Sequence, residues 1–222
     1  MVEPVIEVKD LVKRYDGREP VLDGISFSVK QRELVTVYGK SGCGKTTLLN
    51  ILGGLDRPTA GEVRIDGRDI VGLDESELAG IRLAKIGFIF QDFNLLTDLT
   101  VRENVALPLK FSGRKDGGCV DELLARFEIR EIADARASMI SGGEAQRTAI
   151  ARAFINEPKI ILADEPTGNL DFDNTQNVIS ILSLAVTDLN ATVILATHDL
   201  ELAKHSTKRL HLEDGKCLVK TR

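Results

Sequence analysis

The chain has 222 residues, of which 43% are hydrophobic, and this composition supports a folded core and argues against intrinsic disorder. Its 29 Lys and Arg residues and 34 Asp and Glu residues give a formal net charge of −5, with no block of like charge, which argues against a nucleic-acid partner. No apolar run approaches the roughly 18 residues that cross a bilayer, and the N-terminus lacks a signal-peptide pattern, so we expect a soluble, cytosolic chain.

Short β-like runs separated by turn signals occupy residues 5–38. The turns are expected at Asp16-Gly17 and Asp23-Gly24, where small or acidic residues precede glycine. This pattern predicts an antiparallel sheet near the N-terminus. Its last run, residues 34–38, leads directly into a glycine-rich loop.

That loop, residues 39–46, matches the phosphate-binding pattern GxxxxGK[ST] without a mismatch. Glycines permit a tight turn whose N–H groups reach phosphate oxygens, Lys45 supplies a charge for the β- and γ-phosphates, and the Thr46 hydroxyl can ligate Mg²⁺. A helix is expected over 46–52, with its N-terminal end facing the phosphates. A chance glycine-rich turn is the alternative, but strand, loop and helix occur in the order that the chemistry requires. The predicted nucleotide contacts are Gly39, Lys40, Ser41, Gly42, Cys43, Gly44, Lys45, Thr46 and Thr47.

The middle of the chain changes from strands to helices. A loop at 56–61 and a strand at 62–67 are followed by a compact apolar strand, 86–90, which ends at Gln91. Helices are expected from 100 to 124, broken by a loop at 112–118, and over 121–127 and 142–156. One face of the first of them carries Val101, Asn104, Val105 and Leu109. We predict an α/β core formed by residues 1–91 and 157–222, with a helical lobe inserted at about 92–156.

The C-terminal part returns to alternating strands and helices. Buried strands are expected at 159–164 and 192–196, an amphipathic helix at 173–189 and a hairpin at 208–220. Such alternation predicts a mostly parallel sheet with its ligand at the carboxyl ends of the strands.

Two further groups of residues suggest chemistry. Asp164 ends an apolar strand and could hold Mg²⁺ through its water shell, while the adjacent Glu165 could orient or deprotonate an attacking water. An ordinary solvated strand end is the alternative reading. Ser141-Gly142-Gly143 opens a helix and could be a second anion cradle, although the same tripeptide is common in turns and helix caps.

Together, SGGE followed by QR, LADEPTGNLD and ATHD resemble the ATP-binding cassette superfamily over essentially the whole chain. The resemblance implies an α/β P-loop NTPase core with a mostly parallel sheet, an N-terminal antiparallel subdomain and an inserted helical lobe. It also implies Mg²⁺-dependent ATP hydrolysis by two subunits. The motif Ser141, Gly142, Gly143 and Glu144 of one subunit would bind the ATP that the other subunit holds.

The resemblance assigns roles to single residues as well. Tyr15 would stack on adenine, Gln91 would contact Mg²⁺ and the transmembrane partner, and His198 would contact the γ-phosphate. Glu165 would be the catalytic carboxylate, and residues 168–171 would reach across the dimer. Tyr15 could instead pack on the sheet and His198 could be structural; His205 and His211 are interpreted as structural. Two positions depart from the usual pattern, with Ile140 in place of Leu and Glu144 in place of the frequent Gln, but the site should remain competent.

Within the superfamily, LGGLDRPTAGEV, GFIFQDFNLL and ENVALPL resemble one branch. It contains the ATPases of lipoprotein-releasing, macrolide-efflux and antimicrobial-peptide-resistance systems, and the related cell-division ATPase. The branch implies a homodimer held at the cytoplasmic face of the membrane by permease subunits.

Three other functions stay open. A cell-division-type ATPase would regulate a membrane partner without transport. A soluble ATP-driven clamp on DNA or ribosomes would call for a coiled-coil insertion or two cassettes and a basic surface. A kinase or GTPase would leave the Ser141 motif and His198 without a role.

The joint near Gln91 carries a run of apolar residues. Phe88 and Phe90 are expected in the core because they alternate with Ile89 on a buried strand. Phe93, Leu95 and Leu96 follow the strand, where a loop is normally polar. We therefore expect an exposed apolar groove there that accepts an amphipathic helix of a membrane subunit.

Overall fold

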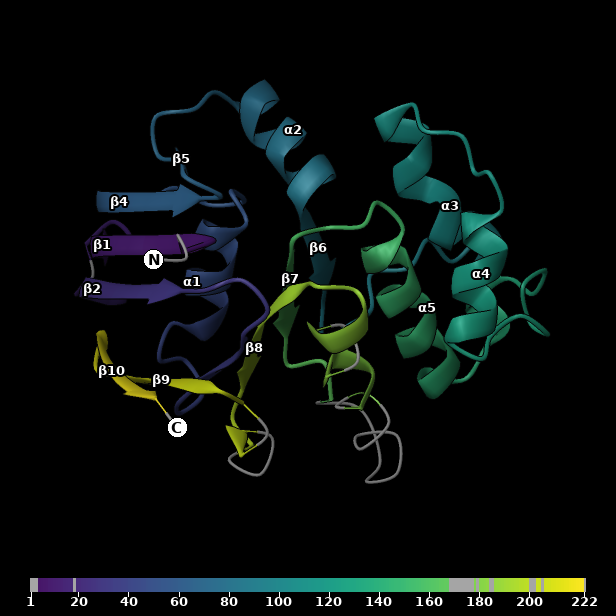
Figure 1. Cartoon of the computed structure of the whole chain (residues 1–222). Helices are drawn as coiled ribbons and strands as arrows, with labels where there is room; N and C mark the ends of the chain where they lie inside the picture. Colours follow the sequence, from purple (N-terminus) through teal and green to yellow (C-terminus); the bar gives the residue numbers. More distant parts are fainter. Residues whose placement is uncertain are drawn as a thin grey trace.

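The structure is a computed structural model, and it describes residues 4–17, 19–167, 178, 180–183, 186–199, 203–204 and 206–221. In it, the N-terminal strands form an antiparallel sheet. The strand order is β2-β1-β4-β5, and the strands are β1 (Ile6–Lys13), β2 (Leu22–Val29), β4 (Ala60–Ile65) and β5 (Arg68–Asp69). The sheet lies at one end of the molecule in Figure 1, next to the C-terminal hairpin. The predicted antiparallel subdomain is confirmed.

A second sheet of six strands has the order β10-β9-β3-β8-β7-β6. Its strands are β3 (Leu34–Tyr38), β6 (Ile86–Ile89), β7 (Ile160–Asp164), β8 (Thr192–Thr197), β9 (Lys208–Glu213) and β10 (Lys216–Thr221). All neighbouring pairs are parallel except β9 and β10, which form the predicted hairpin. The mostly parallel sheet predicted from the alternation of strands and helices is therefore confirmed.

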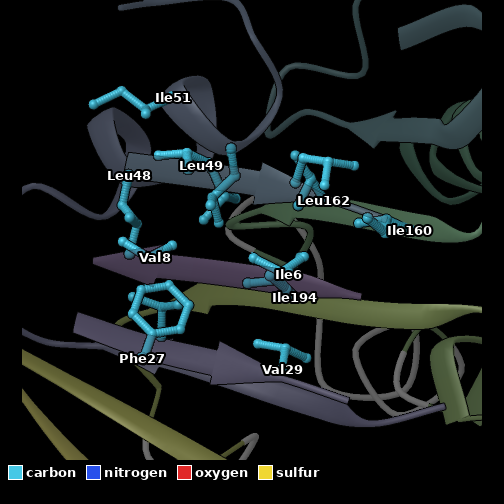
Figure 2. Packing of buried hydrophobic residues seen from close by; sticks show 14 of the residues in the cluster. Ile6, Val8, Phe27, Val29, Leu48, Leu49, Ile51, Ile160, Leu162 and Ile194 are labelled. Atoms are coloured by element: carbon cyan, nitrogen blue, oxygen red, sulfur yellow. The ribbon is translucent and has the colours of Figure 1, made fainter. Parts of the chain in front are cut away.

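Helix α1 (Lys45–Leu52) packs between the two sheets. Leu48 and Leu52 are fully buried, and they belong to one apolar cluster with residues of both sheets. Figure 2 shows this cluster, in which the labelled side chains come from the following residues: Ile6, Val8, Phe27, Val29, Leu48, Leu49, Ile51, Ile160, Leu162 and Ile194. At about 1.5–3 kcal/mol per fully buried aliphatic side chain, this cluster holds the phosphate loop on a rigid base.

The opposite face of the parallel sheet is covered by α5 (Gly142–Phe154). Because side chains alternate along a strand, Ile160 and Leu162 of β7 face α1, whereas Ile161 and Ala163 belong to the second apolar cluster together with α5. α3 (Val101–Ser112) and α4 (Cys119–Arg126) pack against α5 in the same cluster. The predicted boundaries of the helical lobe stay a prediction.

The predicted face of α3 is confirmed. Its buried residues are Val101, Asn104, Val105 and Leu109. The helix begins at a capping box, in which the Thr100 side chain accepts the Glu103 N–H and the Glu103 carboxylate accepts the Thr100 N–H. The predicted helix 173–189 lies partly outside the described residues, but Val178 and Leu182 are buried in the second cluster.

One helix, α2 (Glu75–Lys85), was not anticipated. Only Leu78 and Ile81 are buried, so its apolar face is too narrow to give a strong helical period. The local signal lies in its first turn, where Asp74 and Glu77 form a second capping box. Among the residues that the structure describes, no helix is long and apolar enough to cross a membrane.

Candidate functional site

The phosphate loop follows β3 and is closely packed. A side chain at Gly39 would begin only 2.2 Å from the Leu212 carbonyl oxygen of β9, so that position admits glycine alone. Gly44 has a φ of 103°, a left-handed conformation that a side chain disfavours. These two constraints bring the loop backbone tightly over the carboxyl end of the parallel sheet.

Helix α1 begins at this loop without a side-chain cap and without an acidic residue in its first turn. Uncapped N–H groups at a helix N-terminus favour anions such as phosphate. A cavity of about 470 Å³ opens here, within the size range of nucleotide and cofactor sites. Its lining consists of Val21, Ser41, Gly42, Gly44, Lys45, Thr46, Thr47, Gln91, Glu165 and His198. The structure thus brings together predicted residues from the ends of β6, β7 and β8 and from the loop after β3.

Three charged or titratable side chains form a chain across the cavity. The Lys45 Nζ donates to the carbonyls of Gly39 at 3.1 Å and Lys40 at 3.3 Å, and it lies 3.5 Å from the Glu165 Oε1. The Glu165 Oε2 lies 2.9 Å from the His198 Nδ1. Glu165 is therefore held between a cation and an imidazole, at the position where the terminal phosphate of a nucleotide on the loop would lie.

Glu165 also has an unusual backbone. Its φ is 45°, and a non-glycine residue in this region costs about 1–3 kcal/mol unless its surroundings fix it. Its N–H donates to the Ala196 carbonyl at 2.9 Å, which ties the residue to the next strand. Strain of this kind is concentrated at active sites, so the backbone agrees with a functional carboxylate.

Asp164 lies beside Thr46, which lines the cavity. Burial raises the pKa of the Asp164 carboxyl and the charge of Glu165 raises it further, while a hydrogen bond to the Thr46 side chain and the Lys45 charge oppose the shift. One carboxylate oxygen, Oδ1, is buried with no hydrogen-bond partner within the part of the chain that the structure describes. Oxygen ligands of this type, together with a hydroxyl and an amide, are what Mg²⁺ binds in proteins. The residues therefore fit a divalent cation.

Tyr15 lies outside this cavity, and 41% of it is exposed. Its hydroxyl donates to the Asp56 Oδ2 at 2.8 Å, and the Lys13 Nζ lies 4.6 Å from its ring centroid. Lys13 in turn donates to the Asp56 Oδ1 at 2.6 Å. No sequence pattern predicts this network, since Asp56 is 41 positions from Tyr15. The role of the ring stays a prediction.

Lys40 and Cys43 line a neighbouring cavity of about 480 Å³ that faces the C-terminal hairpin. Ser41 and Gly42 line both cavities, so the loop itself separates the two. His211 also borders the second cavity and stacks on Tyr38 with ring centroids 4.7 Å apart. His205 lies outside the described residues.

The Ser141 motif begins α5. The Glu144 carboxylate accepts the Ser141 N–H at 2.8 Å and its hydroxyl at 2.7 Å, and this capping box lowers the pKa of Glu144. Because α5 and α1 lie on opposite faces of the sheet, the structure does not bring Ser141, Gly142, Gly143 and Glu144 to the phosphate loop of the same chain. The loop 168–171 lies outside the described residues.

A larger groove of about 580 Å³ lies between α2, α3, α5 and β6, and it corrects two sequence predictions. Phe90 was expected in the core, but it is half-buried and lines the groove. Phe88, which stacks on it at 5.5 Å, also lines the groove but packs against the first apolar cluster as expected. Side chains alternate along this strand, so Ile86 and Phe88 lie on the face of the first cluster and Ile89 lies on the face of the second. Phe93, Leu95 and Leu96 are absent from the lining; Leu83, Leu107 and Phe111 from α2 and α3 take their place.

Comparison with known proteins adds family evidence to this geometry. The family model described as ABC transporter matches residues 22–168. The macrolide export ATP-binding/permease protein MacB of Syntrophobacter fumaroxidans is 44% identical over 95% of this chain, but the chain spans only 31% of that protein. The lipoprotein-releasing system ATP-binding protein LolD 1 of Chlorobium chlorochromatii is 41% identical over 93% of this chain and 86% of its own length.

Solved structures agree with the fold. The ATP-binding cassette MJ0796, in a dimeric post-hydrolysis state bound to ADP and Pi, superposes with a TM-score of 0.90 at 39% identity. The match covers 97% of this chain and 98% of that one. The cassette cbiO1 of Clostridium perfringens, part of the transporter complex cbiONQ, gives a TM-score of 0.88 at 26% identity.

Proposed function

Since this chain belongs to the ABC transporter family, we propose that it binds and hydrolyses ATP as the motor subunit of a membrane transporter. The observation that carries the proposal is the cavity in which Lys45, Glu165 and His198 meet above the uncapped start of α1. A P-loop supplies phosphate contacts, and a carboxylate at its rim supplies a group that can orient water.

ATP would be held by the loop amides of residues 39–46 and by Lys45, with Tyr15 beside the base. Mg²⁺ would be held by Thr46, Gln91 and Asp164, and when bound it neutralises charge on the phosphates. The buried oxygen of Asp164 supports this assignment because it has no other hydrogen-bond partner among the described residues.

Glu165 would orient the attacking water and accept its proton, since it lies 2.9 Å from His198 and 3.5 Å from Lys45. His198 is 68% exposed at its side chain, and it lines the same cavity, so it is free to contact the terminal phosphate from the solvent side. Lys45 would stabilise charge that develops on the transferred group.

Two copies of the chain would form two composite sites. Ser141, Gly142, Gly143 and Glu144 start a helix on the face of the sheet opposite to α1, so a second copy must bring them to the nucleotide. The capping-box arrangement leaves the start of α5 on the surface with its Ser141 hydroxyl exposed, as an anion site between subunits requires. The dimeric MJ0796 cassettes support this arrangement.

The partners would be permease subunits, and the chain would lie at the cytoplasmic face of the membrane as a peripheral subunit. The names of the MacB and LolD relatives support an export or lipoprotein-release system. The groove between α2, α3 and α5 would receive an amphipathic helix of the permease, because Leu55 and Phe111 at its borders are 49% and 72% exposed.

A cell-division-type regulator without transport is the second candidate, since it would use the same groove and the same ATP sites. A soluble clamp on nucleic acid is disfavoured by the net charge of −5.

The test is the ATPase activity of the purified protein with Mg²⁺, compared with that of Glu165→Gln. The variant should lose hydrolysis about 100-fold or more, as expected for removing a general base, while its ATP affinity stays within about twofold. ATP binding rests on Lys45 and the loop amides, which the substitution leaves in place. Wild-type turnover by the variant would refute the assignment of Glu165, and no hydrolysis by the wild-type protein would refute the proposed activity.

A further inference from the structure

The groove that the proposed function assigns to a partner helix has an unusual charge content. Its lining includes two arginines, Arg82 and Arg152, but no aspartate or glutamate. The other polar residues are Asn94 and Asn156, and most of the remaining lining is apolar. Two guanidinium groups therefore lie in a concave surface that excludes much of the water around them.

The charge of Arg82 is already matched. Its Nη2 lies 2.5 Å from the Glu75 Oε1 on the same helix, and its Nη1 donates to the Gly54 carbonyl at 2.8 Å. Glu75 is in the first turn of α2, where the helix dipole also favours a carboxylate. Arg82 is thus held by an ion pair that needs no partner.

Arg152 is different. Its Nη1 donates to the Asn94 carbonyl and its Nη2 to the Phe93 carbonyl, each at 2.7 Å. No carboxylate pairs with it anywhere in the described ranges of the chain, and burial lowers the pKa of its guanidinium. A half-buried charge with only carbonyl partners keeps part of its desolvation cost, and a carboxylate beside it would offset that cost by charge attraction and a charge-assisted hydrogen bond.

We propose that the partner helix in this groove carries a carboxylate that pairs with Arg152. The proposal rests on the proposed function, because it names the chemistry of the membrane subunit that docks there. An amphipathic helix would bury its apolar face against Phe88, Phe90 and Phe111, and an acidic residue on that face would meet the one groove arginine that lacks a counter-charge among the described residues.

The ion pair between Arg152 and the partner's carboxylate would also affect the nucleotide site. The two carbonyls that Arg152 holds belong to Phe93 and Asn94, both in the left-handed region with φ of 60° and 49°. The turn follows Gln91 by two residues, and Gln91 lines the nucleotide cavity. A carboxylate that draws the guanidinium toward the groove weakens the hold on this strained turn, so the position of Gln91 depends on whether the partner is docked.

The experiment measures the affinity of the purified chain for nanodiscs that hold the membrane subunit with which the wild-type chain co-purifies. Arg152→Gln removes the charge, and Arg152→Lys keeps it. The matched control is Arg126→Gln, since Arg126 lies on α4, pairs with Asp188 at 3.2 Å and does not line the groove. Arg152→Gln should weaken binding about 30-fold or more, as expected when one member of a desolvated ion pair is lost, whereas Arg152→Lys and the control should bind within about fivefold of wild type.

The partner side is tested independently of how Arg152 variants fold. Each acidic residue in the cytosolic segments of the membrane subunit is changed singly to its amide. One of these changes should weaken binding as much as Arg152→Gln does. Combined with Arg152→Gln, that change should not weaken binding further, because both substitutions remove the same ion pair. Equal binding by wild type and Arg152→Gln, or no effect of any partner amide, would overturn the pair. Failure of the wild-type chain to co-purify with any membrane subunit would instead overturn the proposed transporter function.

Discussion

At the scale of single residues, Asp164 combines a buried carboxylate oxygen that lacks a partner within the described chain with a raised pKa. A raised pKa in the folded state means that ionisation destabilises the fold, and this cost grows as the pH rises through the folded pKa. The ionised carboxylate therefore destabilises the fold locally. Such a weakness is expected where a cation binds.

We predict that Asp164→Asn raises the melting temperature at pH 7 by about 2–4 °C, because the amide keeps the shape and removes the charge. The gain should disappear as the pH falls below the ordinary carboxyl value of 3.8, where wild-type Asp164 is protonated in both states. Added Mg²⁺ should stabilise the wild-type protein and not the variant. Thermal melts between pH 3 and 8 measure both effects, and a lower melting temperature for the variant at pH 7 contradicts the account.

Asp56 gives a second prediction at this scale. It accepts hydrogen bonds from both Tyr15 and Lys13, and Lys13 lies over the Tyr15 ring at 4.6 Å. These contacts fix the ring with one face toward Lys13. If the other face stacks on adenine, Asp56→Ala should weaken ATP binding about five- to tenfold, at the lower end of what base–aromatic stacking contributes.

Inorganic tripolyphosphate serves as the matched ligand, because it has the phosphates but no base. Its affinity should be the same for wild type, Asp56→Ala and Tyr15→Ala. The double variant should bind ATP no more weakly than Tyr15→Ala, since Asp56 acts through the ring. An equal loss for tripolyphosphate in a competition assay would show that Asp56 supports the phosphate loop instead.

At the scale of elements, Asp66 joins three of them. It lies in the turn after β4, and its carboxylate binds the Lys85 Nζ at 2.6 Å, at the end of α2, and the Lys159 Nζ at 2.8 Å, before β7. The hydrogen bonds from Lys159 and then Lys85 lower the pKa of Asp66. A lowered pKa contributes stability above the unfolded value of 3.8, and this contribution is lost as the pH falls through the folded pKa.

We predict that Asp66→Asn lowers the melting temperature at pH 7 by about 2–4 °C, because each exposed ion pair contributes at most about 1 kcal/mol. Asparagine tolerates the φ of 50° at this position, so the substitution isolates the charge. The difference from wild type should shrink toward pH 3 and in high salt. A difference that does not change with salt would mean that the turn conformation, and not the ion pairs, is what Asp66 supplies.

The elements nearest the nucleotide could be predicted because their signals are local. The pattern of residues 39–46 requires a strand before it and a helix after it, and the Thr100 capping box starts α3 beside a clear apolar face. Helix α2 has only two buried residues, so its period is weak and its capping pattern was the sole signal. The contact between Tyr15 and Asp56, and the groove that Phe88 and Phe90 line, depend on segments far apart in the chain that no local pattern brings together.

At the scale of the whole molecule, the sheet keeps the two proposed ATP-binding motifs apart. The phosphate loop and α1 lie on one face and the Ser141 helix, α5, on the other, so one copy supplies only half of each proposed site. The central claim is therefore that ATP joins two copies and that hydrolysis separates them. Glu165→Gln should trap the joined state, because it binds ATP without hydrolysing it.

The most direct measurement is sedimentation velocity of Glu165→Gln with and without Mg-ATP. The account predicts a monomer without nucleotide and a dimer with Mg-ATP. It also predicts that Glu165→Gln combined with Ser141→Arg stays monomeric, because the bulky cation replaces the hydroxyl at the start of α5. A Glu165→Gln protein that remains monomeric with saturating Mg-ATP at high protein concentration, or a dimer that forms equally well with Ser141→Arg, would contradict the account.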